Sequence, residues 1–428
     1  MTNTYEKIRG EVVAGGALGE EDPVAGGPRA VLGLSAIGLL LLLLLLVAPW
    51  AFVFVIGLLI SIFLHETGHF VAARKSGMKV TQFFMGMGPK LWSFRRGEIE
   101  YGVRALPIGA FVRIIGMNNL DETAAEDEPR AYRNMSYPRR MITICAGSIM
   151  HMLIAIVLIF GVYAVAGKGQ AGDRYILGSV SARTPASSTV VTTQPGILNP
   201  LEAGDRIISI AGSTPTSSKD MANIIKSHQV GEKIDIVVER DGEILDLTAT
   251  LDARPEGDDD AGKAFLGVTS GFQTVFVKHS LGWTVVHSFT DLGTVTWKSV
   301  GGVVKVLNPV NIWGHVTGSN TDQTTQPTTV YGISKFSSTI GEETGLSGIL
   351  LTLAAVNVFI GLLNLFPLLP FDGGHAAIAT YERIRSRKGK APYRADVGKM
   401  VPVAMAVMTF LVFLLSAGLF LDITRPLK

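Results

Sequence analysis

The sequence has few charged residues and almost no cysteine. Only 17% of its 428 residues are Asp, Glu, Lys or Arg, while 47% are hydrophobic. Soluble domains carry about 25% charged residues, so this composition is typical of a membrane protein. The formal net charge of +2 gives no sign of a nucleic-acid-binding surface. A single cysteine, Cys145, excludes any internal disulfide.

Long apolar runs are what the sequence has instead, and five of them could cross a bilayer. The first apolar block is too long for one span, but Pro49 and Trp50 offer a break within it. The expected fold is therefore a polytopic α-helical membrane protein with about five spans. The predicted spans are Ala30–Val47, Ala51–Ala73, Met141–Val165, Leu346–Phe366 and Val401–Leu421.

Positive charge predicts how these spans are oriented, because cytoplasmic loops are enriched in Lys and Arg. Residues 74–140 contain twelve Lys or Arg in 67 positions, and residues 382–399 contain seven in 18. Residues 167–345 contain only fourteen in 179. We therefore expect the first two segments and the N-terminus to be cytoplasmic and the long segment to lie outside.

The motif His65-Glu66-Thr67-Gly68-His69 ends the second predicted span. On a helix, residues four apart share a face, so both imidazoles can bind one zinc ion while Glu66 activates a water molecule. A random sequence of this length and composition would contain this pattern about 0.01 times. Ionisable groups at the end of an apolar span are costly and usually functional. The motif therefore predicts a catalytic metal site.

A catalytic zinc site needs a third protein ligand, and Asp372 is the best candidate. It lies in the segment NLFPLLPFDGGH, which begins at Asn364 and ends at His375. The prolines break the preceding helix and the two glycines allow a tight turn, so a carboxylate is presented on irregular backbone. For Asn357 and Asn364, hydrogen bonding between helices is the structural alternative to a functional role. His375 could also be a ligand, although a structural role is the stronger expectation.

HETGH followed by NLFPLLPFDGGH resembles the site-2 protease family, and within it the bacterial branch with a single PDZ domain that cleaves anti-sigma factors. The resemblance implies Zn²⁺ bound by His65, His69 and Asp372, with Glu66 as general base and Asn364 near the scissile carbonyl. It also implies a multi-pass protein of the bacterial plasma membrane, with its active site toward the cytoplasm. The implied substrates are single-span membrane proteins such as anti-sigma factors, cut within the lipid bilayer during regulated intramembrane proteolysis.

The sequence departs from the family pattern in two places. The span Ala30–Val47 has no counterpart in the simplest, four-span members. The family favours Gly-x-x-x-Asn at the start of the next core span, whereas this chain reads Gly147-Ser-Ile-Met-His151. His151 could do the work of that asparagine or could only pack between helices.

Two segments outside the spans have strand-like patterns. Alternation around Ile99–Val103 predicts a β-hairpin, which the family resemblance places at the membrane. A hairpin edge could hold an unwound substrate by β-addition, or could be structural only. Residues Tyr175–Leu251 resemble an extracytoplasmic PDZ-like α/β domain, with Tyr175–Val180 as the candidate groove strand. We expect this domain to exclude substrates with bulky outer domains, and the alternative is that its groove binds a peptide C-terminus.

The expected organisation follows from these features, and it names no substrate-binding residues. It comprises a cytoplasmic tail (1–29), two spans (30–73), a cytoplasmic-side hairpin region (74–140), a span (141–166), the PDZ-like domain (167–254), an outer linker with amphipathic helices (255–345), the span with the aspartate motif (346–380), a basic loop (381–400) and the final span with its tail (401–428). Two alternatives are a catalytically silent PDZ-containing membrane scaffold and a metal transporter. The glutamate between the histidines argues against the scaffold, and a fixed third ligand argues against transport.

Overall fold

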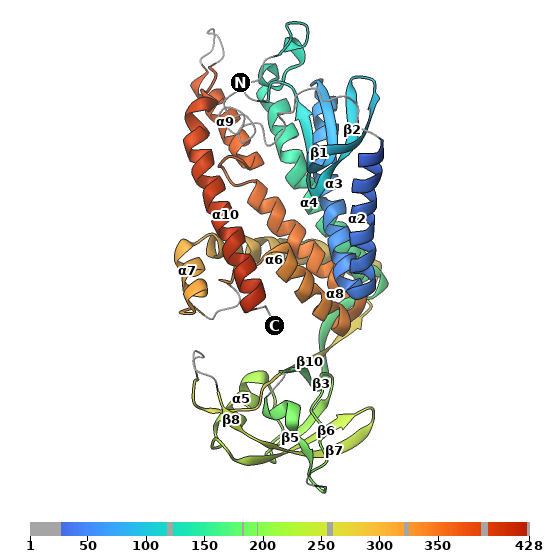
Figure 1. Cartoon of the computed structure of the whole chain (residues 1–428), viewed down its shortest axis with the longest axis vertical. Coiled ribbons are helices and arrows are strands. Elements are labelled where there is room, and N and C mark those ends of the chain that lie inside the picture. The colour runs from blue at the N-terminus through green and yellow to red at the C-terminus, as the bar shows by residue number, and fades with distance from the viewer. Residues whose placement is uncertain are drawn as a thin grey trace. The chain divides into compact units, whose positions relative to one another are not determined.

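The computed structural model describes residues 27–117, 123–181, 184–194, 196–254, 260–320, 325–386 and 393–425. The chain divides into two compact units (Figure 1). One combines Met1–Val165 with Ser280–Lys428 and carries the long helices, and we call it the helical unit. The other, Ala166–His279, is inserted into it and is mainly β-structure, and we call it the inserted unit.

Among its described residues, the helical unit contains five helices that are long and apolar enough to cross a membrane. They agree with the five predicted spans, with differences at their ends. The fourth extends well before the predicted start and changes direction at Gly345, whose φ is 64° and ψ −153°. It ends at Asn364, two residues before the predicted end, where the proline-containing turn begins. The five are α2 (Pro28–Val47), α3 (Pro49–Lys75), α4 (Tyr137–Val165), α8 (Val330–Asn364) and α10 (Val401–Thr424).

Helices α3, α4 and α8 pack against one another and form the core of this unit. Phe54 and Leu58 of α3 are buried against Ile349 and Leu353 of α8. Gly68 permits a close approach of α3 to α4, because a Cβ there would lie 2.7 Å from the carbonyl oxygen of Ala146. Most leucine side chains of α2 remain exposed, as expected for a helix that faces lipid.

The predicted hairpin is present as β1 (Val80–Arg96) and β2 (Ile99–Ile114), but each strand is used twice. Residues 80–87 pair with 100–103 on one side and with 106–114 on the other, while 90–96 pair with 99–104. The result is a small sheet of four segments with 90–96 and 110–114 as its edges. Local alternation predicts the strands, but the second pairing depends on long-range contacts.

Three further α-helices belong to the described part of the helical unit. Helix α6 (Leu281–Val306) packs on α4 and α8, and the Tyr163 hydroxyl of α4 donates a 2.6 Å hydrogen bond to Asp291. Helix α7 (Pro309–Thr317) follows α6, and α9 (Asp372–Arg385) follows the proline-containing turn. Near the end of α10, Asp422 accepts hydrogen bonds from Thr328 and Thr329 at the start of α8.

The inserted unit is a six-stranded sheet with one helix beside it, and its core is formed by buried aliphatic side chains. The strand order is β10-β3-β5-β6-β7-β4. A two-stranded ladder, β8 (Asp252–Ala253) with β9 (Ala264–Phe265), lies apart from it. The elements are β3 (Lys168–Val180), β4 (Val190–Val191), β5 (Arg206–Ile210), α5 (Ser218–Lys226), β6 (Lys233–Arg240), β7 (Glu243–Thr250) and β10 (Val268–Val277).

The assignment of Tyr175–Val180 as a groove strand is wrong. These residues belong to β3, which pairs with β10 along one side and with β5 at Ile176 on the other. An added peptide needs a free edge, and the free edge on this side of the sheet belongs to β10. Strand β10 also lies within the segment that the sequence predicts as linker. Local sequence does not reveal this strand, because its pairing with β3 joins residues about 90 positions apart.

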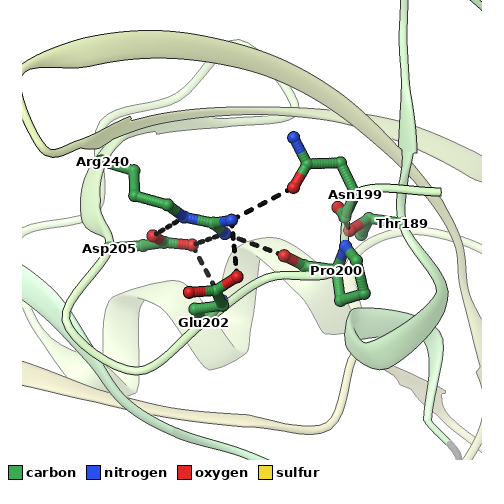
Figure 2. Close-up of polar contacts among 6 residues, drawn as sticks. All are labelled: Thr189, Asn199, Pro200, Glu202, Asp205 and Arg240. Atoms are coloured by element: carbon green, nitrogen blue, oxygen red, sulfur yellow. Dashed lines mark hydrogen bonds and ion pairs between the residues drawn. The ribbon is translucent and has the colours of Figure 1, made fainter. Parts of the chain in front are cut away.

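Residues 199–205 of the inserted unit are held by Arg240 (Figure 2). Its guanidinium group donates two 2.7 Å hydrogen bonds to the buried carboxylate of Asp205. The same group reaches Glu202, the Asn199 side chain and the Pro200 carbonyl oxygen at 2.8–3.1 Å. One arginine at the end of β6 thus fastens a long connection that has almost no regular structure.

Candidate metal centre

Two histidines of α3 and an aspartate at the start of α9 converge inside the helical unit. His65 and His69 lie one turn apart and are 6% and 8% exposed. Their Nε2 atoms are 3.1 Å apart, and Oδ2 of Asp372 lies 3.4 Å from the first and 3.2 Å from the second. The structure therefore brings together the three residues that the sequence predicts as ligands.

This arrangement fits a zinc ion. Bonds of about 2.0–2.1 Å at tetrahedral angles separate ligand atoms by about 3.3 Å, which matches the three distances. Oδ2 of Asp372 is buried and has no hydrogen-bond partner among the residues that the structure describes. Nδ1 of His69 lies 2.8 Å from the Thr143 carbonyl oxygen, which can only accept, so Nδ1 carries the proton. The lone pair of His69 is therefore on Nε2, toward Asp372.

Asp372 is held in place by the turn that precedes it. The backbone of this turn folds over the first residues of α9, and the two glycines after Asp372 make this possible. A Cβ on Gly373 would lie 2.2 Å from the Leu365 carbonyl oxygen, and one on Gly374 would lie 2.5 Å from the Leu369 nitrogen. The Pro and Gly residues that suggest this turn in the sequence thus have a direct steric purpose.

Gly147 of α4 provides the space for the two histidine rings. A Cβ at this position would lie 2.3 Å from Nε2 of His69 and 2.7 Å from Nε2 of His65. In the sequence, Gly147 stands out only as part of a departure from a family motif. Its role depends on a helix crossing between α3 and α4, which local sequence does not show.

The three residues open into a cavity of about 350 Å³ that also contains the other predicted site residues. Glu66 and Asn364 line it, and Oε1 of Glu66 is 3.9 Å from Nε2 of His65. His375 lines the cavity but is not part of the ligand cluster. The edge strand residues 110–114 form another wall. The candidate metal ligands, a carboxylate, an amide and an open strand edge thus face one cavity.

A buried polar chain links three helices beside this cavity. Nδ1 of His151 in α4 is 2.8 Å from Oδ1 of Asn357 in α8. Nδ2 of Asn357 donates to Oγ of Ser61 in α3 at 3.1 Å and to the Leu353 carbonyl oxygen at 2.8 Å. The sequence leaves open what His151 and Asn357 do, and Ser61 carries no sequence signal at all.

A buried ion pair holds α9 against α4. Arg140 donates a 2.8 Å hydrogen bond to Glu382, and the two residues are 7% and 4% exposed. The other carboxylate oxygen of Glu382 accepts from the Ala395 backbone at 2.8 Å. Because Asp372 begins the same helix, this pair helps to fix the position of the third ligand. Neither residue is singled out by the sequence.

Comparison with known proteins identifies the family of the chain. Residues 53–412 match the model of peptidase family M50. The chain is 32% identical to the zinc metalloprotease Rip1 of Mycobacterium tuberculosis, over 88% of this chain and 97% of the relative. It is 29% identical to a putative zinc metalloprotease of Nostoc, over 85% of this chain and 92% of the relative.

A solved PDZ domain of an SdrC-like protein from Listeria monocytogenes matches 24% of this chain and 90% of its own length, with 24% identity and a TM-score of 0.19. The sequence match extends over most of the chain, and the expected histidine and aspartate side chains meet in one buried cluster. The chain belongs to peptidase family M50, the site-2 protease family, and is a membrane zinc metalloprotease.

Proposed function

We propose that this protein is an intramembrane endopeptidase that cuts single-span membrane proteins of the anti-sigma-factor type during regulated intramembrane proteolysis. The observation that carries the proposal is the convergence of His65, His69 and Asp372 beside Glu66 in a unit built from membrane-length helices. A scaffold would not need a carboxylate next to three converging ligands. A fixed, buried ligand set also suits catalysis better than metal transport.

Each site residue has a definite part in the proposed reaction. His65, His69 and Asp372 hold zinc, which when bound supplies a Lewis acid for the scissile carbonyl and its attacking water. Glu66 takes the proton from that water and passes it to the leaving amine. Asn364, on the wall of the same cavity, donates a hydrogen bond from its amide to the carbonyl oxygen.

The open edge at residues 110–114 suits the binding of an unwound substrate. A transmembrane helix hides its peptide groups in hydrogen bonds, and exposing them in lipid costs several kcal/mol for each group. The edge lines the cavity and offers backbone partners to an extended segment. The strand thus allows a substrate helix to open next to Glu66 at a lower cost.

The inserted unit is proposed to bind peptide C-termini produced by an earlier cut on the outer side. Its support is the free edge of β10 with α5 beside it, where Oγ of Ser218 donates to the Ser270 carbonyl oxygen. An extended peptide could add to this edge in the manner of a PDZ ligand. Strand β10 therefore replaces Tyr175–Val180 as the candidate groove strand.

The proposed location is a bacterial plasma membrane, with the N-terminus and the basic segments 74–140 and 382–399 in the cytoplasm. Its support is the charge distribution. An impermeant thiol reagent added outside should label a cysteine placed at Ser218 and should not label one at Tyr5. Labelling at Tyr5 from outside would contradict the proposed orientation.

The substitution Glu66→Gln tests the proposed function most directly. Glutamine cannot accept the proton, but all three ligands remain, so the purified variant should contain zinc and lack cleavage activity. In cells, membrane proteins shortened on the outer side should accumulate as single-span stumps in the variant and not in the wild type. Normal turnover in Glu66→Gln, or the absence of any such stump, would overturn the proposal.

A further inference from the structure

We propose that His151 is a substrate-positioning residue, whose Nε2 accepts a hydrogen bond from a backbone N–H of the bound substrate. This inference rests on the proposed function, because it needs an extended peptide in the cavity. It assigns a role to a side chain that otherwise reads as a helix-packing histidine.

The proton positions in the polar chain are fixed by its two ends. The carbonyl oxygens of Gly57 and Leu353 can only accept hydrogen bonds. Oγ of Ser61, 2.8 Å from the Gly57 oxygen, must therefore donate to it. The Asn357 atom that is 2.8 Å from the Leu353 oxygen must be the amide nitrogen, so the amide oxygen faces His151.

The tautomer of His151 follows from this orientation. Because the Asn357 amide oxygen can only accept, Nδ1 of His151 must carry the proton in their 2.8 Å hydrogen bond. A neutral imidazole protonated on Nδ1 has its lone pair on Nε2. The polar chain thus makes Nε2 a fixed hydrogen-bond acceptor.

The side chain that carries this acceptor belongs to the wall of the catalytic cavity. His151 lines the cavity, and its ring centre is 4.8 Å from that of His65. Within the part of the chain that the structure describes, no hydrogen bond is formed to Nε2. The side chain is only 1% exposed, so its position is set by packing. An acceptor next to the ligands is thus available to a molecule that enters the cavity.

An extended substrate would present the matching donor. A peptide paired with residues 110–114 satisfies the peptide groups along one of its edges. The N–H and C=O groups along its other edge point away from the sheet and need partners of their own at membrane depth. The proposed zinc and Asn364 serve a carbonyl oxygen. His151 supplies the acceptor that an N–H group needs.

Two substitutions separate positioning from packing. The amide of His151→Asn mimics Nδ1 and keeps the link to Asn357, but does not reach the place of Nε2. The amide oxygen of His151→Gln falls near the place of Nε2, and the link to Asn357 is lost. A packing role predicts that Asn is the better replacement, whereas a positioning role predicts Gln. Ser148→Ala, one turn earlier on α4 and also buried, is the matched control.

Binding is measured in the Glu66→Gln background, with a synthetic peptide that covers the membrane span of the stump that accumulates in cells. Loss of one neutral hydrogen bond should raise Kd about fivefold for His151→Asn, the equivalent of about 1 kcal/mol. His151→Gln and Ser148→Ala should stay within about twofold of the parent. Zinc content should be the same in all of these proteins.

A scan of backbone N-methylation along the peptide locates the partner N–H group. N-methylation at one position should weaken binding of the peptide to the parent protein. The same modification should not weaken binding to His151→Asn any further, as expected for a direct contact. If no position behaves in this way, or if Kd is unchanged while kcat falls in the otherwise wild-type enzyme, the inference is overturned. A loss of zinc in His151→Asn would also overturn it. Absence of stumps in cells would instead refute the proposed function.

Discussion

Replacing Gly147 by alanine should remove zinc from the protein without touching any ligand. The added methyl carbon would lie 2.3 Å from Nε2 of His69 and 2.5 Å from Cε1 of His65. Ordinary contacts between such atoms are about 3.5 Å, so the shortfall exceeds 1 Å. Metal sites tolerate displacements of about 0.2 Å. The rings must therefore leave their positions, or α4 must move away from α3.

The size of the effect follows from what milder changes do. Loss of a group that only orients a ligand lowers metal affinity about 10- to 100-fold. Displacing two ligand rings by about 1 Å should cost at least 100-fold. Alanine is about 1 kcal/mol better than glycine within a helix, so α4 itself should not be weakened. The expected product is a folded, zinc-poor and inactive protein.

Zinc content after purification, followed by competition with a chelator, measures this loss. The control is Gly161→Ala on the same helix, where a Cβ would meet nothing within 4 Å. It should retain one zinc per chain and normal activity. Both variants should elute from size exclusion like the wild type. A Gly147→Ala protein with full zinc occupancy and wild-type cleavage would refute the steric argument.

Three further outcomes are expected. Arg240→Ala should destabilise the inserted unit by about 3–5 kcal/mol, because Asp205 is left buried without its partner; thermal unfolding should show a much smaller shift for the exposed Arg206→Ala. Glu382→Gln should leave a buried arginine on α4 without its anion, and this should lower the melting temperature. The retention of zinc should fall about tenfold. Two lysine ammonium groups lower the pKa of Asp260 to about 2. Its contribution to stability should therefore be complete above pH 4 and disappear as the pH falls toward 2, as hydrogen exchange around that carboxylate can show.

Features that a short stretch of sequence encodes could be predicted. The spacing of His65 and His69 is a property of one helix, and the turn before Asp372 is announced by its own prolines and glycines. The five spans depend on local hydrophobicity in the same way. The sheet of the inserted unit could not be predicted correctly, because β3 pairs with a strand about 90 residues away. Ser61 and Asn357 are 296 positions apart, and no local pattern reveals their hydrogen bond.

The order in which the ribosome makes these parts also has a consequence for the cell. The histidines of α3 are synthesised about 300 residues before Asp372, so a nascent chain already inserted in the membrane has only two of its three ligands. Thr328 and Thr329 at the start of α8 can donate their hydrogen bonds to Asp422 only when the last helix is complete. A protease able to cut the membrane proteins around it is thus incomplete until the segments that carry Asp372 and Asp422 have been translated. Its own topology delays activity, as a removable propeptide does in other proteases.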